Sequence, residues 1–207
     1  MSKAKNPFDR IDFSQVSPVP WEPAHSKQSR GFQCIQPLFR TFLSREIPVD
    51  VKHRISKVWL IIAKQKVVAY AATRTDVLRI LDNHGKPKKI VLEDAVYTNV
   101  PSIKIQLLAA DKRAKGAGTR LMKWLLDYIA QEIAPRVGVR FVTVDAYYYE
   151  SNAGEGPYDS SHFYHNKFGF RYVNIQETLP PRDGYRSMYL DLLPLVEGLE
   201  GKRGKMK

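Results

Sequence analysis

The sequence has almost no cysteine and no long apolar run. Cys34 is the single cysteine among 207 residues, so the chain cannot form an internal disulfide. No N-terminal stretch has the apolar core of a signal peptide or of a membrane span. The histidines do not show the spacing of a metal site, because His162 and His165, three residues apart, lack a third partner. We therefore expect a protein of the reducing cytoplasm, with no metal and no membrane partner.

The composition predicts one buried domain with two loosely packed ends. A chain of 207 residues with 43% hydrophobic residues is long enough for one well-buried domain and too short for two large ones. Residues 1–30 contain four prolines among polar neighbours, which predicts an extended or partly disordered N-terminal arm held by Trp21. Residues 31–196 form the predicted single domain, and residues 197–207 a basic, disordered tail.

The chain is strongly basic. A total of 33 Lys and Arg against 21 Asp and Glu gives a formal net charge of +12, which favours polyanionic partners such as CoA, nucleic acid or both. The excess is larger than CoA alone explains comfortably. Each basic cluster by itself is also typical of a solvated surface, so only the coincidence of several clusters on one face would indicate a binding surface.

Hydrophobic periodicity predicts most of the remaining elements. Apolar residues at helical spacing predict a helix over residues 32–47 that ends before Pro48. Residues 58–63 and 67–73 flank a turn and predict an antiparallel hairpin. Further strands are predicted over residues 90–97, 141–146, 172–175 and 187–192, with a flexible excursion over 147–161 and fraying from Leu195 onward.

The stretch from Ser102 to Pro135 predicts a strand, a basic glycine loop and a helix, in that order. Residues 102–110 mix β-branched and long apolar side chains, as a strand does, and Asp111 ends the run with charge. After the loop, apolar residues recur at spacings of three and four and predict one apolar helix face, made of Leu121, Met122, Leu125, Ile129 and Ile133.

A junction of this kind suits anion binding. Gly116 and Gly118 lack a Cβ, so main-chain N–H groups can approach a ligand closely. The helix N-terminus adds a positive dipole end, and Arg113, Lys115 and Arg120 add formal charge. The pattern therefore predicts a phosphate or pyrophosphate site, with a glycine-capped surface turn as the alternative. No third glycine completes G-x-G-x-x-G, and no G-K-S/T closes a P-loop.

The loop resembles the acetyl-CoA loop of GCN5-related N-acetyltransferases (GNATs). Arg113-x-x-Gly116-x-Gly118 directly follows a predicted strand and matches the family pattern Q/R-x-x-G-x-G/A. Downstream, residues 162–170, HFYHNKFGF, are similar to the closing F-Y-x-x-x-G-F segment of the family. The resemblance extends from about Val58 to Leu192. It implies an α/β (α+β) fold, in which helices flank a central mixed, mostly antiparallel sheet with a splayed pair of parallel strands.

The resemblance also implies a reaction, in which acetyl-CoA is the co-substrate and its acetyl group passes directly to a primary amine. Backbone N–H groups near Leu108 and Ala110 would hold the pantetheine arm and polarise the thioester carbonyl. The cofactor-binding residues that the resemblance implies are Leu108, Ala109, Ala110, Arg113, Ala114, Lys115, Gly116, Ala117, Gly118 and Thr119.

In the family, the tyrosine of F-Y-x-x-x-G-F usually protonates the leaving thiolate. This chain has one extra residue before Gly169. Counting back from Gly169 puts His165 at the tyrosine position, whereas counting forward from Phe163 keeps Tyr164 there. A phenol with a pKa near ~10 and an imidazole with a pKa near ~6.5 can both donate a proton to sulfur. Tyr164 and His165 are therefore both candidates for the catalytic acid, with Tyr164 first by residue type.

The general base is open. Family members that act on lysine often have a glutamate on the central strand, where this chain has Lys104 and Gln106. A lysine amine, with a pKa near ~10.4, is mostly protonated at neutral pH, whereas an α-amino group with a pKa near ~8 is partly neutral. The missing carboxylate therefore favours an α-amino acceptor, although Glu93, Asp94 and Asp145 are candidate bases that act through water.

An α-amino acceptor together with a basic surface favours aminoacyl-tRNA as the substrate. The arrangement is similar to GNAT toxins of toxin–antitoxin pairs, which acetylate charged tRNA and are neutralised by a small DNA-binding antitoxin. The partners that this resemblance implies are charged tRNA, an antitoxin protein and a second copy of the chain in a homodimer. Two alternatives stay open: an acetyltransferase for a small-molecule or protein amine, and a CoA- or nucleic-acid-binding module without catalysis.

Overall fold

The computed structural model describes residues 6–80, 82, 86, 88–150, 157–174, 177, 179–181 and 184–204. Part of the predicted excursion, residues 151–156, lies outside the described residues. The chain divides into two compact units. Unit 1 comprises Met1–Arg74 and Gln106–Asp127, and unit 2 comprises Thr75–Ile105 and Tyr128–Lys207. No helix in the described part of the chain is long and apolar enough to cross a membrane.

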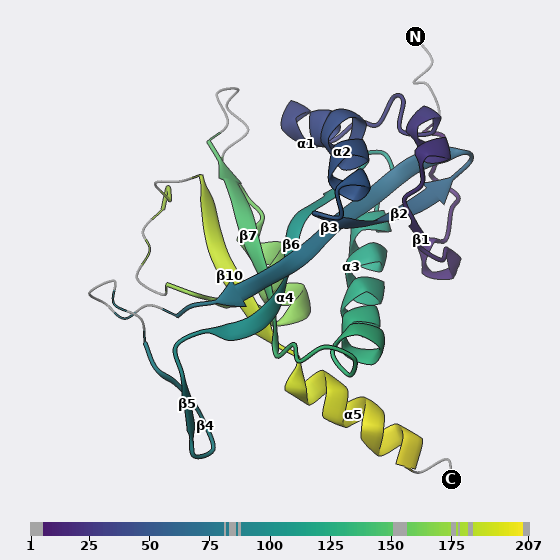
Figure 1. The fold of residues 1–207 in the computed structure, drawn as a ribbon. Helices are drawn as coiled ribbons and strands as arrows, with labels where there is room; N and C mark the ends of the chain where they lie inside the picture. The colour runs from purple at the N-terminus through teal and green to yellow at the C-terminus, as the bar shows by residue number, and fades with distance from the viewer. Residues whose placement is uncertain are drawn as a thin grey trace. The chain divides into compact units, whose positions relative to one another are not determined.

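Unit 1 contains four strands, in whole or in part, and the helices that follow the arm (Figure 1). Their order is β1-β2-β3-β6, where the strands are β1 (Val19–Pro20), β2 (Lys57–Ala63), β3 (Lys66–Leu78), of which unit 1 holds the part up to Arg74, and β6 (Val100–Ala110), of which it holds the part from Gln106. Its helical elements are the 3-10 helices η1 (Phe13–Gln15) and η2 (Pro23–Lys27), helix α1 (Pro37–Thr41), the π-helix η3 (Phe42–Glu46), and helices α2 (Ile47–Lys52) and α3 (Ala117–Tyr128).

The hairpin of β2 and β3 confirms the prediction for residues 58–73. Lys57 pairs with Thr73 at one end and Ala63 with Lys66 at the other. The two residues between the strands, Lys64 and Gln65, both have positive φ, at 48° and 57°. Two-residue hairpin turns with positive φ at both positions strongly prefer Asn-Gly, so this turn holds two side-chain-bearing residues in a strained conformation.

The helical segment after the arm differs from the prediction for residues 32–47. The helix starts at Pro37 and continues through Pro48 to Lys52. Pro48 lies in the first turn of α2, directly after the π-helix η3, so the segment changes its hydrogen-bond pattern where the proline lacks an N–H. Tyr70 of β3 anchors the segment, since its hydroxyl donates a 2.7 Å hydrogen bond to the carbonyl oxygen of Phe39 and its ring stacks with that of Phe42.

The described part of the arm packs on unit 1 through three aromatic side chains. Phe8, Phe13 and Trp21 are all buried, and the N–H of Trp21 donates to the carbonyl oxygen of Val58. Burial of three large rings stabilises the arm, at roughly 1.5–3 kcal/mol for each fully buried apolar side chain. The arm is therefore a structured part of unit 1 over residues 6–30, rather than only an extended segment.

Unit 2 contains the end of β3 from Thr75, the start of β6 up to Ile105, and the strands that follow them, in the order β3-β6-β7-β10-β9, with β8 paired to β7. The additional strands are β4 (Ile90–Leu92), β5 (Ala95–Tyr97), β7 (Phe141–Tyr149), β8 (Tyr158–Asp159), β9 (Arg171–Tyr172) and β10 (Tyr185–Asp191). The helical elements are the π-helix η4 (Ile129–Ile133), α4 (Ser161–Phe168) and α5 (Leu193–Gly204).

The sheet is mostly antiparallel and contains one parallel pair, which confirms the predicted fold class. β6 and β7 run parallel and pair from Ser102 with Phe141 to Ile105 with Val144. The paired residues end there, although β6 continues to Ala110 and β7 to Tyr149. The antiparallel neighbour β10 pairs with β7 over all of β10, from Tyr185 with Tyr147 to Asp191 with Phe141.

Two predictions for unit 2 were wrong in detail. Residues 90–97 do not form one strand, because a turn at Glu93 and Asp94 folds them into the β4–β5 hairpin. Glu93 has a φ of 53°, a value that an acidic turn residue adopts more readily than a strand residue. At the C-terminus, α5 extends over Leu193–Gly204, where the sequence predicts fraying and a disordered tail.

The strained turn of the β2–β3 hairpin gives a stability prediction. The double substitution Lys64→Asn, Gln65→Gly should raise the free energy of unfolding by roughly 1 kcal/mol, because it places the preferred residues at the two positive-φ positions. Chemical denaturation measures this, with Lys64→Ala as the control that keeps the strain. An unchanged or lower free energy of unfolding in the double variant would contradict the strained turn.

Candidate functional site

The glycine loop begins where β6 ends, and backbone hydrogen bonds fix its first two residues. The N–H of Asp111 donates to the carbonyl oxygen of Val68 on β3 at 2.8 Å. The N–H of Lys112 donates to the carbonyl oxygen of Gln33 at 2.7 Å. Two separate segments of unit 1 therefore hold the start of the loop, and the chain leaves β6 in a defined direction.

The carboxylate of Asp111 is the buried centre of this region. It accepts hydrogen bonds from the N–H of Gln33 at 2.9 Å and from the N–H of Arg113 at 3.0 Å. The guanidinium of Arg113 binds it in a bidentate manner, at 2.8 and 2.7 Å. Burial by itself raises the pKa of Asp111, but these donors outweigh the burial and hold the pKa below its ordinary value.

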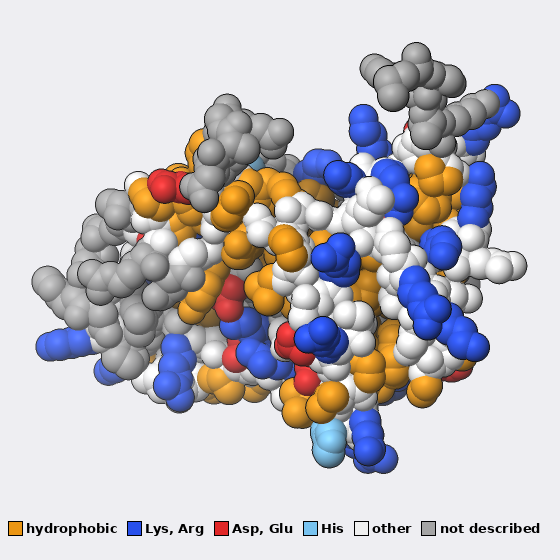
Figure 2. All heavy atoms as spheres, turned by 90° about the horizontal axis from the view of Figure 1, so that it is seen from above, with side chains coloured by type: hydrophobic (Ala, Val, Ile, Leu, Met, Phe, Trp, Pro, Cys, Tyr) orange, Lys and Arg blue, Asp and Glu red, His pale blue; other side chains and the backbone are white. Residues whose placement is uncertain are grey.

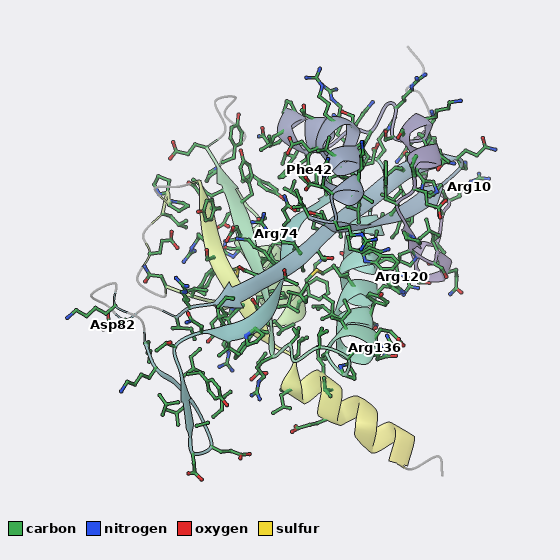
Figure 3. All side chains as sticks on the ribbon, in the orientation of Figure 1. Arg10, Phe42, Arg74, Asp82, Arg120 and Arg136 are labelled. Carbon is green, nitrogen blue, oxygen red and sulfur yellow. The ribbon has the colours of Figure 1, made fainter. Side chains whose placement is uncertain are left out.

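The arm covers the same arginine. The guanidinium of Arg113 lies 5.5 Å from the ring centre of Phe8 and also donates to the carbonyl oxygen of Gly31 at 2.9 Å. The side chain of Asn6 donates to the carbonyl oxygen of Arg113 at 2.8 Å. Arg120, which Figure 3 labels on α3, donates to the carbonyl oxygen of Val16 at 3.2 Å. The guanidinium of Arg113 is therefore paired within the protein and adds no free charge to the loop, whereas Arg120 uses one N–H on a neutral carbonyl and keeps its charge.

The main chain of the loop carries N–H donors that are not used within the described part of the protein. Within the described residues, the N–H groups of Lys115, Gly116, Gly118 and Thr119 have no hydrogen-bond acceptor. Three of them are at or next to the start of α3, where the helix dipole is positive. Lys115 and Gly116 are exposed, and Gly118 and Thr119 are half-buried. The loop is thus an open set of backbone donors with the exposed Lys115 ammonium beside it.

The two loop glycines are required for different reasons. Gly116 has a φ of 93°, which a residue with a Cβ rarely adopts. Gly118 would place a Cβ 3.2 Å from the Cβ of Ala110, so its lack of a side chain lets α3 begin close to the end of β6. Ala114 and Ala117 are buried, whereas Lys115 and Gly116 between them are exposed. Leu108 and Ala110 are half-buried on β6, and Ala109 between them is buried.

Tyr164 and His165 belong to α4 in unit 2, and their environments differ. Tyr164 is 5% exposed and packs against the ring of Phe170 at 5.6 Å between centroids. Burial raises the pKa of Tyr164 above its ordinary value, and the neighbouring Tyr158 raises it further. Tyr164 therefore keeps its proton over the whole neutral range.

His165 is exposed and takes part in the end of α4. Its Nδ1 lies 2.9 Å from the carbonyl oxygen of Phe170, and its ring stacks on that of Tyr172. Because a carbonyl oxygen only accepts, Nδ1 carries the proton in this contact, and the neutral ring has a lone pair at Nε2. Gly169 ends the helix in the left-handed conformation, with a φ of 74°.

Among the candidate bases of unit 2, Asp145 is engaged by other side chains, and Glu93 and Asp94 lie in an exposed turn. Asp145 of β7 forms an ion pair with Lys104 of β6 and accepts a 2.8 Å hydrogen bond from the hydroxyl of Ser187. Both of its oxygens are therefore occupied. Glu93 and Asp94 lie in the exposed turn of the β4–β5 hairpin. Within the described residues, no group of three histidine, cysteine or acidic side chains is placed to hold a metal ion.

Comparison with known proteins identifies the fold. No protein-family model matches the sequence, and no curated protein matches it. Among solved structures, a tyrosine-to-phenylalanine mutant of the toxin AtaT is 14% identical, with a TM-score of 0.63 over 92% of this chain and 99% of that chain. A tyrosine-to-phenylalanine mutant of KacT is 17% identical, with a TM-score of 0.63 over 89% and 99%. The chain has the fold of GNAT-like toxins. A structure described as a bacterial toxin gives the same TM-score at 15% identity, over 89% and 95%.

The sequence alone does not point to the residues that hold the loop in place. It predicts Asp111 only as the end of a strand. A carboxylate two residues before the loop arginine is nevertheless a signal in the sequence, since such a spacing allows a bidentate contact. The contributions of Phe8, Asn6 and Gln33 are tertiary and have no local signal. The predicted cofactor residues, from Leu108 to Thr119, belong to unit 1, whereas Tyr164 and His165 belong to unit 2.

Removing the Asp111 carboxylate tests its role in the loop. Asp111→Asn should lower the free energy of unfolding by about 2 kcal/mol, because the Arg113 guanidinium loses its ionic partner. The loss is limited because the Arg113 side chain is 32% exposed, so that water can solvate its charge. Because folding lowers the Asp111 pKa, its contribution is fully present above the unfolded value of about 3.9 and is lost as pH falls through the folded pKa. Denaturation at several pH values measures this. An Asp111→Asn variant with the wild-type acid dependence would contradict it.

Proposed function

We propose that this protein is an N-acetyltransferase that transfers the acetyl group of acetyl-CoA to a primary amine, with the α-amino group of an aminoacyl-tRNA as the acceptor. The observation that carries the proposal is the open set of N–H donors at Lys115, Gly116, Gly118 and Thr119, in a fold shared with GNAT-like toxins. Solved neighbours with this fold include AtaTR bound with AcCoA and AtaT complexed with acetyl-methionyl-tRNAfMet.

The loop donors would bind the diphosphate of acetyl-CoA. Backbone N–H groups at a helix start provide hydrogen bonds and a positive dipole end to a phosphate without any side-chain rearrangement. Arg113 acts here as a positioning residue, because its guanidinium is occupied by Asp111 and Gly31. Leu108, Ala109 and Ala110 would contribute main-chain contacts to the pantetheine arm and the thioester carbonyl.

Tyr164 is the favoured acid for the leaving thiolate. When the neutral amine attacks the thioester carbonyl, the carbon–sulfur bond breaks and the sulfur leaves with the electron pair, so it needs a proton. A buried phenol with a raised pKa is protonated at neutral pH and can supply that proton. Neutral His165 has its ring proton on Nδ1, in contact with Phe170, and presents a lone pair at Nε2. His165 would be an acid only as imidazolium.

The absence of a free carboxylate at Asp145, and of any at Lys104 and Gln106 on the central strand, favours an α-amino acceptor. Asp145 is engaged by Lys104 and Ser187, and Gln106 accepts a hydrogen bond from Ser56 at 2.7 Å. An α-amine, which is partly neutral at pH 7, needs no strong base, whereas a lysine side chain does. The net charge of +12 suits an RNA-linked amine, and Figure 2 shows that Lys and Arg side chains are more frequent than Asp and Glu on the face in view. The proposal includes a small DNA-binding antitoxin as the protein partner; among the solved neighbours, an AtaT mutant is bound to the C-terminus of the antitoxin AtaR.

The pH dependence of acetyl transfer distinguishes the two acid candidates. With Tyr164 as the acid, kcat/KM should not fall between about pH 7 and 9, because burial holds the phenol pKa above its usual value of ~10. An acid that loses its proton within this range would instead make kcat/KM fall as the pH rises. Tyr164→Phe should lower kcat by about a hundredfold or more, whereas His165→Asn should have little effect. The reverse pattern in the two variants would overturn the assignment.

An assay with parallel acceptors tests the substrate. Radiolabelled acetyl-CoA is incubated with aminoacyl-tRNA, the same tRNA without its amino acid, free amines, and lysine peptides. Label should appear on the α-amino group of the aminoacyl-tRNA, and not on the uncharged tRNA. Transfer only to lysine peptides or small amines would select the alternative acceptor class. No transfer to any acceptor, with CoA still bound, would favour a non-catalytic binding module.

A further inference from the structure

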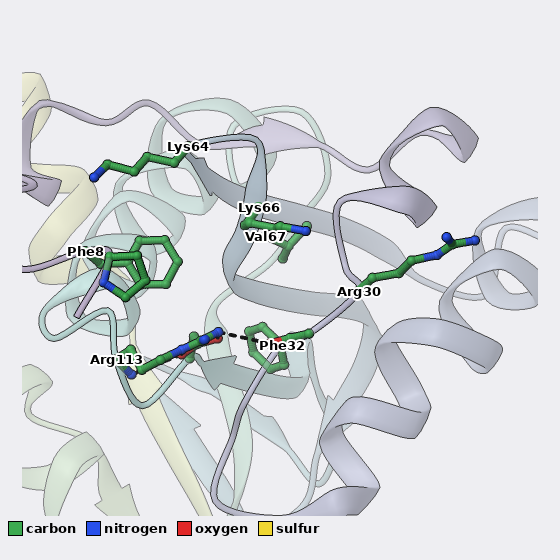
Figure 4. A pocket seen from close by; sticks show the side chains of 10 residues that line it. Phe8, Arg30, Phe32, Lys64, Lys66, Val67 and Arg113 are labelled. Carbon is green, nitrogen blue, oxygen red and sulfur yellow. Dashed lines mark hydrogen bonds and ion pairs between the residues drawn. The ribbon is translucent and has the colours of Figure 1, made fainter. Parts of the chain in front are cut away.

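A pocket of about 320 Å³ lies in unit 1, where residues of the arm and residues at the start of the glycine loop both line it. Figure 4 looks into this pocket, which we call the arm pocket. Phe8, Phe32 and Val67 form its apolar walls, and the turn of the β2–β3 hairpin supplies Lys64 and Lys66. Its volume is at the lower end of the range of small-molecule pockets, about 300–1,000 Å³.

The arm pocket has an excess of positive charge that no described side chain neutralises. Its lining contains Arg30, Lys64, Lys66 and Arg113, against Asp111 as the single carboxylate among the lining residues. Asp111 is already paired with Arg113, so three cations are left without an ion pair in the part of the chain that the structure describes. Figure 4 shows that Lys64 extends toward the side of Phe8, and Lys66 toward the side of Arg30.

A second hollow continues the arm pocket along the arm. It has a volume of about 290 Å³, shares Pro7 and Lys64 with the arm pocket, and adds Arg10. Its carboxylate, Asp9, accepts a 2.6 Å hydrogen bond from the side chain of Asn6. The two hollows together form a basic trough, in which cations from the arm and from the hairpin turn are brought together.

The hairpin turn carries an independent sign of function. Lys64 and Gln65 both have positive φ, where Asn and Gly are favoured. Strained backbone of this kind is concentrated at binding and catalytic sites, because stability alone selects against it. Lys64, one of the pocket cations, is itself at a strained position, and Lys66 directly follows the other strained position, Gln65.

From these observations we propose that the arm pocket binds successive phosphate groups of a nucleic-acid strand, and that none of the backbone donors that would hold the diphosphate of CoA takes part. The three unpaired cations would contact phosphate oxygens, and the apolar walls of Phe8, Phe32 and Val67 would face the sugar or base. A strand suits the site better than a lone ion because the trough extends from the arm pocket along the arm to Arg10.

The test is the binding of a fluorescent single-stranded RNA of about 12 nucleotides to the full chain, measured by anisotropy at several salt concentrations. No acetyl-CoA is present, so the result does not depend on the proposed acetyl transfer. Lys64→Ala, Lys66→Ala should weaken binding about tenfold at low salt. It should also reduce the slope of log Kd against log salt by about 1.4, which corresponds to two lost phosphate contacts on a single strand.

The matched control removes the same charge elsewhere in unit 1. Lys52→Ala, Lys123→Ala takes two exposed lysines from α2 and α3, neither of which lines the arm pocket. This control should bind RNA nearly as the wild type does, and Lys64→Arg, Lys66→Arg should retain binding. The Lys64→Asn, Gln65→Gly variant should bind RNA more weakly than wild type while unfolding at higher denaturant.

Three outcomes would overturn the proposal. Equal losses in the pocket variant and the control would mean that the chain attracts RNA by overall charge alone. Absence of RNA binding to the wild-type chain would exclude the site. Titrations with inorganic phosphate and with AMP distinguish the possible sources of the phosphate. Binding of these small molecules to the pocket without binding of RNA would mean that the ligand is a free small molecule and not a strand.

Discussion

A buried carboxylate must be compensated by donors, and the compensation of Asp111 organises the cofactor side of this protein. Its four hydrogen bonds come from Gln33 and Arg113, so they join the loop to the segment before α1. Arg113 in turn contacts Gly31 and the ring of Phe8. One charge thus positions the end of β6, the glycine loop and the arm. Because an unpaired carboxylate would cost several kcal/mol when buried, these segments hold one another in place.

This use of Arg113 changes how the loop binds an anion. A basic glycine loop suggests binding by formal charge, but the guanidinium of Arg113 is paired with Asp111, and Arg120 donates one hydrogen bond to the carbonyl oxygen of Val16. The main chain of the loop adds N–H donors, and in it Gly116 provides the backbone turn and Gly118 the close approach of α3 to β6. Backbone donors are fixed before the ligand arrives, so the binding of a diphosphate requires little reorganisation. Besides the exposed Lys115 of the loop, three cations without an ion pair in the described part of the chain, Arg30, Lys64 and Lys66, line the arm pocket.

The sequence predicted the local elements better than the contacts between them. The β2–β3 hairpin, β6 and α3 follow from periodicity, and the GNAT-like fold follows from two motifs in the right order, the second of which includes α4. The sequence did not predict that Pro48 continues a helix, because a proline in the first turn and a proline that breaks a helix have the same local pattern. The ordered arm was also missed, since the burial of Phe8 and Phe13 depends on surfaces supplied by distant segments. For the acid, counting residues left Tyr164 and His165 equal, and only their burial and hydrogen bonds separate them.

The central claim is that main-chain N–H groups from Lys115 to Thr119 bind the diphosphate of CoA. Titration of the isotopically labelled protein with CoA, followed by amide NMR, tests this directly. The account predicts large saturable shifts of the Lys115, Gly116, Gly118 and Thr119 amides, and weaker binding in a Gly118→Ala variant, whose new Cβ would meet Ala110. Saturable CoA binding that leaves these four amides unshifted would contradict it.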